Sequence, residues 1–146
     1  MRALTAPLYE LSEFEEIRKL LKKPGKYAAL TGCVESQKLH MAYGLSEGVR
    51  CRLIVTFSDQ RMKELQEDYR FYDRNTACFP ARDVIFYQAD IHGNQLTKER
   101  IRCLRRMMEG RPFTVVTTFG SLLAPQIPLS VFRDNVITVS CNGSLD

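Results

Sequence analysis

Short apolar runs that alternate with amphipathic segments constrain the fold of this chain more than any other feature of its sequence. Positions 52–57 and 113–118 are rich in apolar and β-branched residues, and similar runs occupy 27–31, 76–79 and 135–140. Runs of this length are typical of buried strands, and their alternation with helices indicates parallel strands joined by right-handed crossovers. The sequence therefore predicts an α/β fold, an open and mostly parallel sheet with helices on both faces.

Capping signals place the predicted helices between these strands. A Ser-x-x-Glu capping box starts a helix over 12–23, Ser58 caps another, and a short helical turn is expected around 121–123. Thr97 is expected to cap a helix with its arginines outward and four apolar residues inward: Ile101, Leu104, Met107 and Met108. The stretch 81–96 is expected to be an irregular loop.

The composition fits one domain inside the cell. The chain has 146 residues, of which 45% are hydrophobic, so it can bury an ordinary core. No run approaches the ~20 apolar residues that a membrane span requires, and no signal peptide is evident. Five cysteines without Cys-x-x-Cys spacing indicate neither a disulfide framework nor a zinc site. We expect a soluble cytoplasmic domain, residues 1–146, without a metal, cut from the N-terminus of a longer protein.

Residues 31–39 have the layout of a phosphate-binding loop that lacks two of its required residues. A working loop reads Gly-x-x-x-x-Gly-Lys-Ser/Thr: its glycines let backbone N–H groups surround the phosphates, its lysine reaches them, and its hydroxyl holds Mg²⁺. Here Gln37 replaces the second glycine and Leu39 replaces the hydroxyl residue. We expect a degenerate loop that does not hydrolyse ATP, formed by Gly32, Ser36, Gln37 and Lys38. The alternative is a chance placement of a glycine and a lysine around an unrelated turn.

Loops that follow parallel strands are where ligands usually bind in such sheets. The carboxyl ends of the strands should bring together Gly32, Ser58, Pro80 and residues 118–120. Any phosphate or partner site is therefore expected at this end of the sheet.

The segment 98–111 carries as much net positive charge as the whole chain. It holds six basic and two acidic residues, and the formal net charge of the chain is +4. One interpretation is a DNA-binding patch formed by Lys98, Arg102, Arg105 and Arg106. The other is the solvated face of a surface helix. The small total charge does not require a nucleic-acid partner, and this helix has no aromatic residue to stack on bases.

Four blocks, taken in order, resemble the N-terminus of the bacterial transcription-repair coupling factor, the Mfd family. They are the loop at 31–38, a Phe-Pro-Ala-Arg-Asp segment at 79–83, the predicted helix at 95–104 and the strand and turn at 115–123. The resemblance spans nearly the whole chain and rests on the order and spacing of the blocks. It implies the first subdomain of a UvrB-like module, with a P-loop-NTPase-like fold and a degenerate, non-hydrolytic phosphate loop.

The resemblance also implies what the parent protein does. In that family the parent displaces RNA polymerase stalled on damaged double-stranded DNA and recruits UvrA for nucleotide excision repair. Its ATP and Mg²⁺ serve a separate helicase-like translocase, so no cofactor is implied here. The main UvrA surface lies in the next subdomain, so no partner residue can be assigned. This chain would be a non-catalytic scaffold for its neighbouring subdomains.

Three alternatives belong to other classes. The UvrB protein itself would need a working loop and a long β-hairpin, for which too few residues separate Phe79 from Thr97. A stand-alone DNA-binding module would use the basic helix at 98–111. A nucleotide-binding module would use the residual loop at 32–38, where a helix N-terminus and one lysine could favour an anion.

Overall fold

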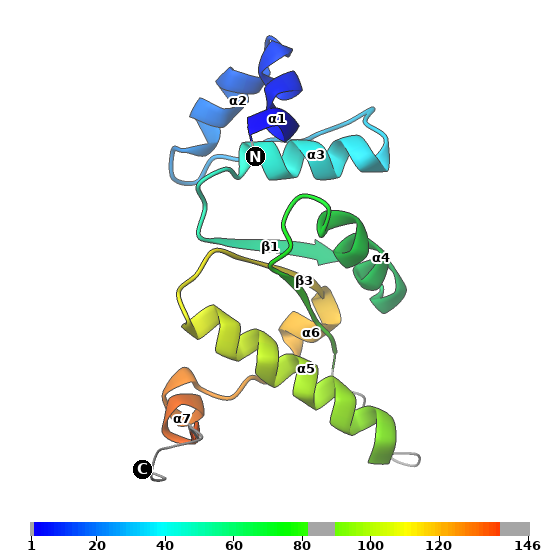
Figure 1. Ribbon diagram of the computed structural model, residues 1–146, viewed down its shortest axis with the longest axis vertical. Coiled ribbons are helices and arrows are strands. Elements are labelled where there is room, and N and C mark those ends of the chain that lie inside the picture. Colours follow the sequence, from blue (N-terminus) through cyan, green and yellow to red (C-terminus); the bar gives the residue numbers. More distant parts are fainter. Residues whose placement is uncertain (1, 82–89, 138–146) are drawn as a thin grey trace.

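The structure is a computed structural model that describes residues 2–81 and 90–137. Its elements follow in the order α1 (Arg2–Thr5), η1 (Ala6–Glu10), α2 (Phe14–Leu21), α3 (Glu35–Leu45), β1 (Cys51–Thr56), α4 (Asp59–Tyr69), β2 (Thr76–Phe79), α5 (Asp90–Met108), β3 (Phe113–Thr118), α6 (Phe119–Leu123) and α7 (Leu129–Asp134). Figure 1 shows the helices gathered around the strands, with α1, α2 and α3 at one end and α7 at the other.

The strands form a parallel three-stranded sheet in the order β1-β3-β2. In its register Cys51 lies opposite Phe113, and Thr76 lies opposite Thr114. The central strand β3 is buried along its whole length, which is the pattern of a strand covered on both faces. The predicted parallel α/β sheet is therefore confirmed.

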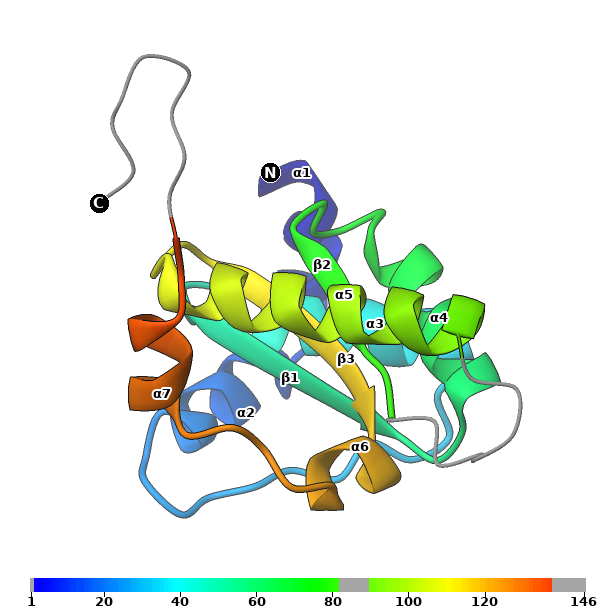
Figure 2. The same ribbon diagram turned by 90° about the horizontal axis from the view of Figure 1, so that it is seen from below.

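Helices cover both faces of this sheet, also as predicted. Figure 2 shows α5 across one face, with α3 and α4 behind the strands on the other. The α3–α4 side has a core of Leu39, Tyr43, Met62, Leu65, Tyr69 and Val116. The α5 side has a smaller core of Phe79, Cys103, Phe113 and Val115. Adjacent β3 residues Val115 and Val116 point to opposite faces and so anchor one core each.

The N-terminal elements pack on the outer side of α3. Phe14 and Leu8 are buried there, and a Cβ added to Gly44 of α3 would clash with Leu8 Cδ1. The absence of a side chain at this position lets η1 and α2 approach the helix closely. His40 Nε2 lies 2.5 Å from the carbonyl oxygen of Leu4, so this histidine also fixes the N-terminal segment.

The strand predicted at 27–31 does not form. These residues contain no assigned strand, and the side chain of Tyr27 is 85% exposed. β3 pairs on both of its sides, so a fourth strand could join only at the outer edge of β1 or β2. The apolar run lacks a ladder partner and stays on the surface.

Two predicted helix starts are wrong. α2 begins at Phe14 and has no side-chain cap, because the Ser12 hydroxyl hydrogen-bonds the Glu13 carboxylate and lowers its pKa. α5 begins at Asp90, which places Thr97 inside the helix. Packing of α5 along β2 outweighs a single capping residue. The expected irregular loop is thus helical from position 90, and residues 82–89 lie outside the described part of the chain.

The inward face of α5 is also rotated relative to the prediction. Ile101 and Met107 are exposed, whereas Arg100 and Cys103 are buried. A basic side chain occupies the inner face because the sheet supplies partners for its head group, as described below. The predicted strand at 135–140 is not formed over 135–137, where α7 has just ended, and its remainder lies outside the described residues.

Candidate functional site

The degenerate phosphate loop lies next to the carboxyl end of β1. Gly32 has a φ of +72°, the left-handed conformation that glycine adopts without strain. The other three predicted loop residues, Ser36, Gln37 and Lys38, lie in the first turns of α3. Arg61, in the first turn of α4 just after β1, contacts Glu35 at the start of α3. This ion pair places the N-termini of the two helices side by side, as expected for a ligand-binding edge of the sheet.

Gln37 caps the helix from within the loop. Its Oε1 accepts a hydrogen bond of 3.2 Å from the backbone N–H of Val34. In a working loop such an N–H would be available to a phosphate oxygen. The residue that replaces the second glycine therefore satisfies a backbone donor that a nucleotide would need.

Glu35 forms ion pairs with the basic residues beside the loop. Its Oε1 lies 2.7 Å from Lys38 Nζ, and its Oε2 contacts Arg61 Nη2. Hydrogen bonds from Lys38 and then Arg61 lower the pKa of the Glu35 carboxyl, so this group is an anion at neutral pH. Arg61 Nη1 in turn lies 3.0 Å from Glu64 Oε2. The lysine that should reach a phosphate is already paired with a carboxylate of its own helix.

Leu39 stands where the metal-binding hydroxyl of a working phosphate loop would lie. This side chain is buried in the core on the α3–α4 side of the sheet, so it points away from the loop. Ser36 and Lys38, near the start of α3, are exposed, and so is Gly32 before the helix. Within residues 2–81 and 90–137, no group of three or more His, Cys, Asp or Glu side chains could hold a metal ion.

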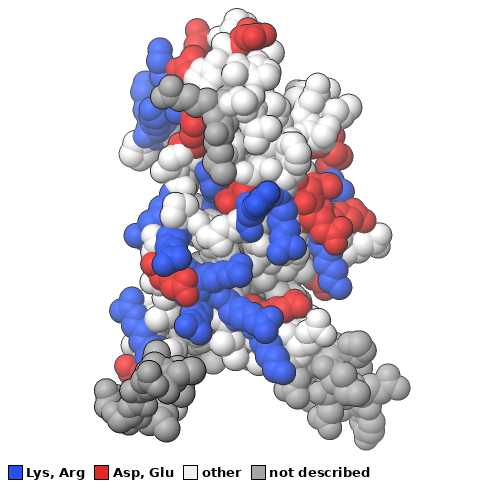
Figure 3. All heavy atoms as spheres, in the orientation of Figure 1, with Lys and Arg blue, Asp and Glu red and all other residues white. Residues whose placement is uncertain are grey.

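The predicted basic patch on α5 is exposed but divided. Arg102 and Arg106 line a groove between α4 and α5, whereas Lys98 and Arg105 do not. Arg105 Nε lies 3.7 Å from Glu109 Oε1. Figure 3 shows basic side chains over the region of α5, with acidic ones among them. The arrangement is a mixed charged surface on which two arginines face a groove.

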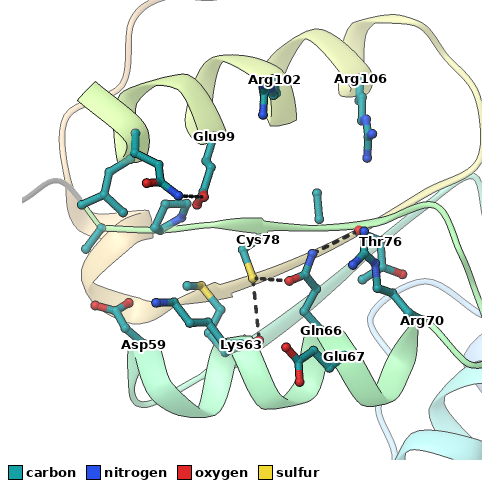
Figure 4. Close-up of a pocket in the computed structure, with 16 residues that line it drawn as sticks. Asp59, Lys63, Gln66, Glu67, Arg70, Thr76, Cys78, Glu99, Arg102 and Arg106 are labelled. Carbon is teal, nitrogen blue, oxygen red and sulfur yellow. Dashed lines mark hydrogen bonds between the residues drawn. The ribbon is translucent and has the colours of Figure 1, made fainter. Parts of the chain in front are cut away.

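This groove, of about 720 Å³, is the feature that the sequence did not reveal. Figure 4 shows β2 at its base, with Arg102 and Arg106 projecting from α5 on one side, and with Glu67 of α4 and Arg70, just after the end of α4, on the other. It arises because β2 is an edge strand, and the strand order cannot be read from the sequence. The only available signal was the pair of basic residues four apart on one helix face.

Arg100 departs most from the prediction. Its guanidinium stacks over Phe79 with its centre 4.0 Å from the ring centroid, and Nη1 donates to the carbonyl of Pro80. Nη2 donates to Gln126 Oε1 at 2.7 Å. This buried residue fastens α5 to the end of β2 and to the segment after α6 rather than facing solvent.

Burial removes two cysteines from thiol chemistry. Desolvation raises the pKa of Cys78 to about 11 and that of Cys103 to about 12. Both thiols are therefore protonated at neutral pH. Cys33, in the degenerate loop, is half-buried, and its Sγ lies 3.7 Å from the Thr31 carbonyl oxygen.

In the part of the chain that the structure describes, no helix combines the length and apolar character needed to cross a membrane. A comparison with protein-family models, curated proteins and solved structures found no match.

Proposed function

We propose that this chain is a non-catalytic scaffold subdomain of the UvrB-like module of a transcription-repair coupling factor. The observation that carries the proposal is the self-occupied phosphate loop. Glu35 pairs with Lys38, Gln37 caps the helix and Leu39 is buried, so each altered position has a structural use that competes with nucleotide binding. The fold supports a degenerate relative of P-loop NTPases in which three parallel strands and their flanking helices remain.

Exposed apolar side chains at the carboxyl edge of the sheet support a scaffold role. Phe57 follows β1 and is 84% exposed, and Leu123 in α6 after β3 is 83% exposed. Phe119 and Leu122 are exposed beside it. Apolar surface of this kind is characteristic of an interaction site, and neighbouring subdomains of a longer chain would cover it.

In this proposal the parent protein carries the activity. It displaces stalled RNA polymerase from damaged double-stranded DNA, uses ATP and Mg²⁺ in a separate motor, and recruits UvrA through the UvrB-like module. The present chain holds its neighbours in position. Its own loop takes no part in ATP turnover.

The first test is isothermal titration of the chain with Mg-ATP. We expect no binding heat at millimolar nucleotide, and the same result for Lys38→Ala, because Lys38 is engaged by Glu35. Micromolar binding by the wild type that disappears in Lys38→Ala would show a working nucleotide site and refute the scaffold assignment.

The second test concerns repair. This chain replaces the matching subdomain of a bacterial transcription-repair coupling factor, and repair of ultraviolet damage is measured on transcribed and non-transcribed strands. We expect preferential repair of the transcribed strand, unchanged by Lys38→Ala. A folded, normally expressed chimera that loses this preference would contradict the family assignment. It would say nothing about nucleotide binding, so each test can fail without the other.

A stand-alone DNA-binding module is the second candidate. Its support is that Arg102 and Arg106 are exposed and make no ion pair within the described residues. It predicts duplex binding that weakens steeply with salt and is lost in Arg102→Glu/Arg106→Glu. We expect no such binding at physiological salt, because Glu99 and Glu67 line the same groove.

A further inference from the structure

We propose that the edge of β2 that faces away from β3 binds an extended acidic peptide segment, which joins the sheet as an added strand in the groove between α4 and α5. This interaction surface goes beyond the scaffold role and does not depend on it. Three features carry the proposal: the orientation of the β2 backbone, the hydrogen bonds at the two ends of the strand, and the charge of the groove walls.

One side of the β2 backbone faces the groove rather than β3. The carbonyl oxygen of Asn75 accepts a 3.0 Å hydrogen bond from the backbone N–H of Thr114, so Asn75 faces β3. Because facing alternates along a parallel ladder, Ala77 and Phe79 also face β3, whereas Thr76 and Cys78 face outward. Within the described residues β2 pairs with β3 alone. An open strand edge of this kind is a template for another strand.

Side chains hold the outward carbonyls at both ends of the strand. Gln66 Nε2 donates to the Thr76 carbonyl oxygen at 3.4 Å, and Arg100 Nη1 donates to that of Pro80. Between them lies the outward backbone N–H and C=O pair of Cys78. A docked strand forms hydrogen bonds with both of these backbone groups, and its alternate side chains contact the walls of the groove. The Cys78 backbone is thus the expected centre of pairing.

Basic side chains give part of the groove a positive charge. Figure 4 shows Arg70 and Arg106 beside the Thr76 end of β2 and Arg102 above its middle, near Cys78, while Asp59 lies toward the opposite end. Lys63 lines the groove as well. None of these four cations forms an ion pair within the part of the chain that the structure describes. Acidic side chains of a docked strand would meet them, which gives the segment both its charge and its direction.

The same walls favour a peptide over a nucleic acid. Asp59, Glu67 and Glu99 line the groove and would repel a phosphate backbone. No aromatic side chain of the described residues lines it, so bases would lack a stacking platform. A peptide can place acidic groups beside the arginines and neutral or basic groups beside the carboxylates.

The test uses fluorescein-labelled eight-residue peptides and fluorescence anisotropy. The probe alternates valine and glutamate. One control replaces glutamate by lysine, and a second keeps the charge but has a central proline that removes a backbone donor. We expect the acidic probe to bind and both controls to fail. Binding of the proline peptide as tightly as the probe would reduce the interaction to charge alone and overturn strand addition.

Matched variants locate the site. Arg102→Glu/Arg106→Glu should weaken the acidic probe about tenfold or more, since two attractive charges become repulsive. Arg105→Glu lies on the same helix but outside the groove and should leave affinity within about twofold. Equal effects of the two replacements would overturn the assignment to the groove.

Amide hydrogen exchange followed by NMR reads the backbone directly. The Cys78 amide should exchange rapidly in the free chain and slowly with the acidic probe bound. Protection of this amide before peptide is added would show that the edge is already occupied and refute the proposal. So would an absence of binding at millimolar probe, or an oligothymidine that binds while the acidic probe does not.

Discussion

At the scale of single residues, the predicted phosphate loop contains an anion of its own. Glu35 supplies within the chain the negative charge that a nucleotide would bring, and it does so at a helix N-terminus where an anion is favoured. Gln37 and Leu39 have structural uses of their own, and Lys38 pairs with Glu35. Gly32 still takes the left-handed turn that the loop requires.

Removing the Glu35 carboxylate should expose this site. In Glu35→Gln, Lys38 and Arg61 lose their shared anion, and we expect inorganic phosphate at millimolar concentration to shift the backbone NMR signals at the start of α3. The wild type should show no such shift. Glu64→Gln, which removes a partner of Arg61 only, is the matched control. Identical titrations of wild type and Glu35→Gln would contradict this role of Glu35.

Gly32→Ala should lower the free energy of unfolding by about 1 kcal/mol, because alanine is strained at a φ of +72°. Gly120→Ala is the control, since Gly120 lies in α6 without a positive φ and its added Cβ would meet nothing nearer than 3.9 Å. Urea denaturation of the two variants measures the difference. Equal stability of both would show that the loop backbone relaxes freely.

At the scale of elements, α5 is held to the sheet by a buried cation as much as by apolar packing. Arg100 stacks on Phe79 and bonds the Pro80 carbonyl, next to the buried Cys103. The helix can therefore keep most of its arginines in solvent and still orient one inward.

Arg100→Met should preserve the apolar stem and lose the hydrogen bonds to Pro80 and Gln126. We expect a loss of about 3 kcal/mol in the free energy of unfolding, since charged hydrogen bonds in a buried site are removed together. Arg105→Met, on the exposed face, should stay within about 0.5 kcal/mol of wild type. Comparable values for the two variants would mean that the Arg100 contacts contribute little to stability.

The elements that could be predicted are those whose signal is local. β1, β2 and β3 were readable from β-branched runs, and α4 from Ser58, whose Oγ accepts from the N–H of Arg61 at 3.2 Å. The strand predicted at 27–31 is wrong because strand formation depends on a neighbouring strand, which no local sequence pattern specifies. The predicted inner face of α5 is wrong because helical periodicity places a charged residue such as Arg100 on the outer face. The buried contacts of Arg100 with Phe79 and Pro80 depend on the tertiary fold. The groove required the strand order and so could not be foreseen.

At the scale of the whole molecule, the buried thiols make stability depend on alkaline pH. The pKa of Cys103 is about 12 in the folded chain, above the value near 9 of an exposed thiol. From about pH 9 upward the unfolded state loses this proton while the folded state retains it, so stability falls as pH rises toward 12. Cys78, with a pKa of about 11, contributes in the same direction.

Urea denaturation between pH 7.5 and 10.5 checks this expectation. The stability difference between wild type and Cys103→Ala should be constant below about pH 8.5 and shrink above it, because only the wild type has a thiol to ionise on unfolding. Cys51→Ala, at an exposed cysteine, is the control for replacing a thiol outside the core. A difference that stays constant across the range would show that Cys103 ionises as easily in the folded state as in the unfolded state.

The central position of β3 also sets the order of events when the chain is made. β1 and β2 emerge from the ribosome first, yet they do not pair with each other, and both wait for Phe113–Thr118. Before β3 is synthesised, neither of the other described strands has its ladder partner, and both cores lack their β3 residues. We therefore expect the described sheet to form in one step once β3 is available, rather than strand by strand.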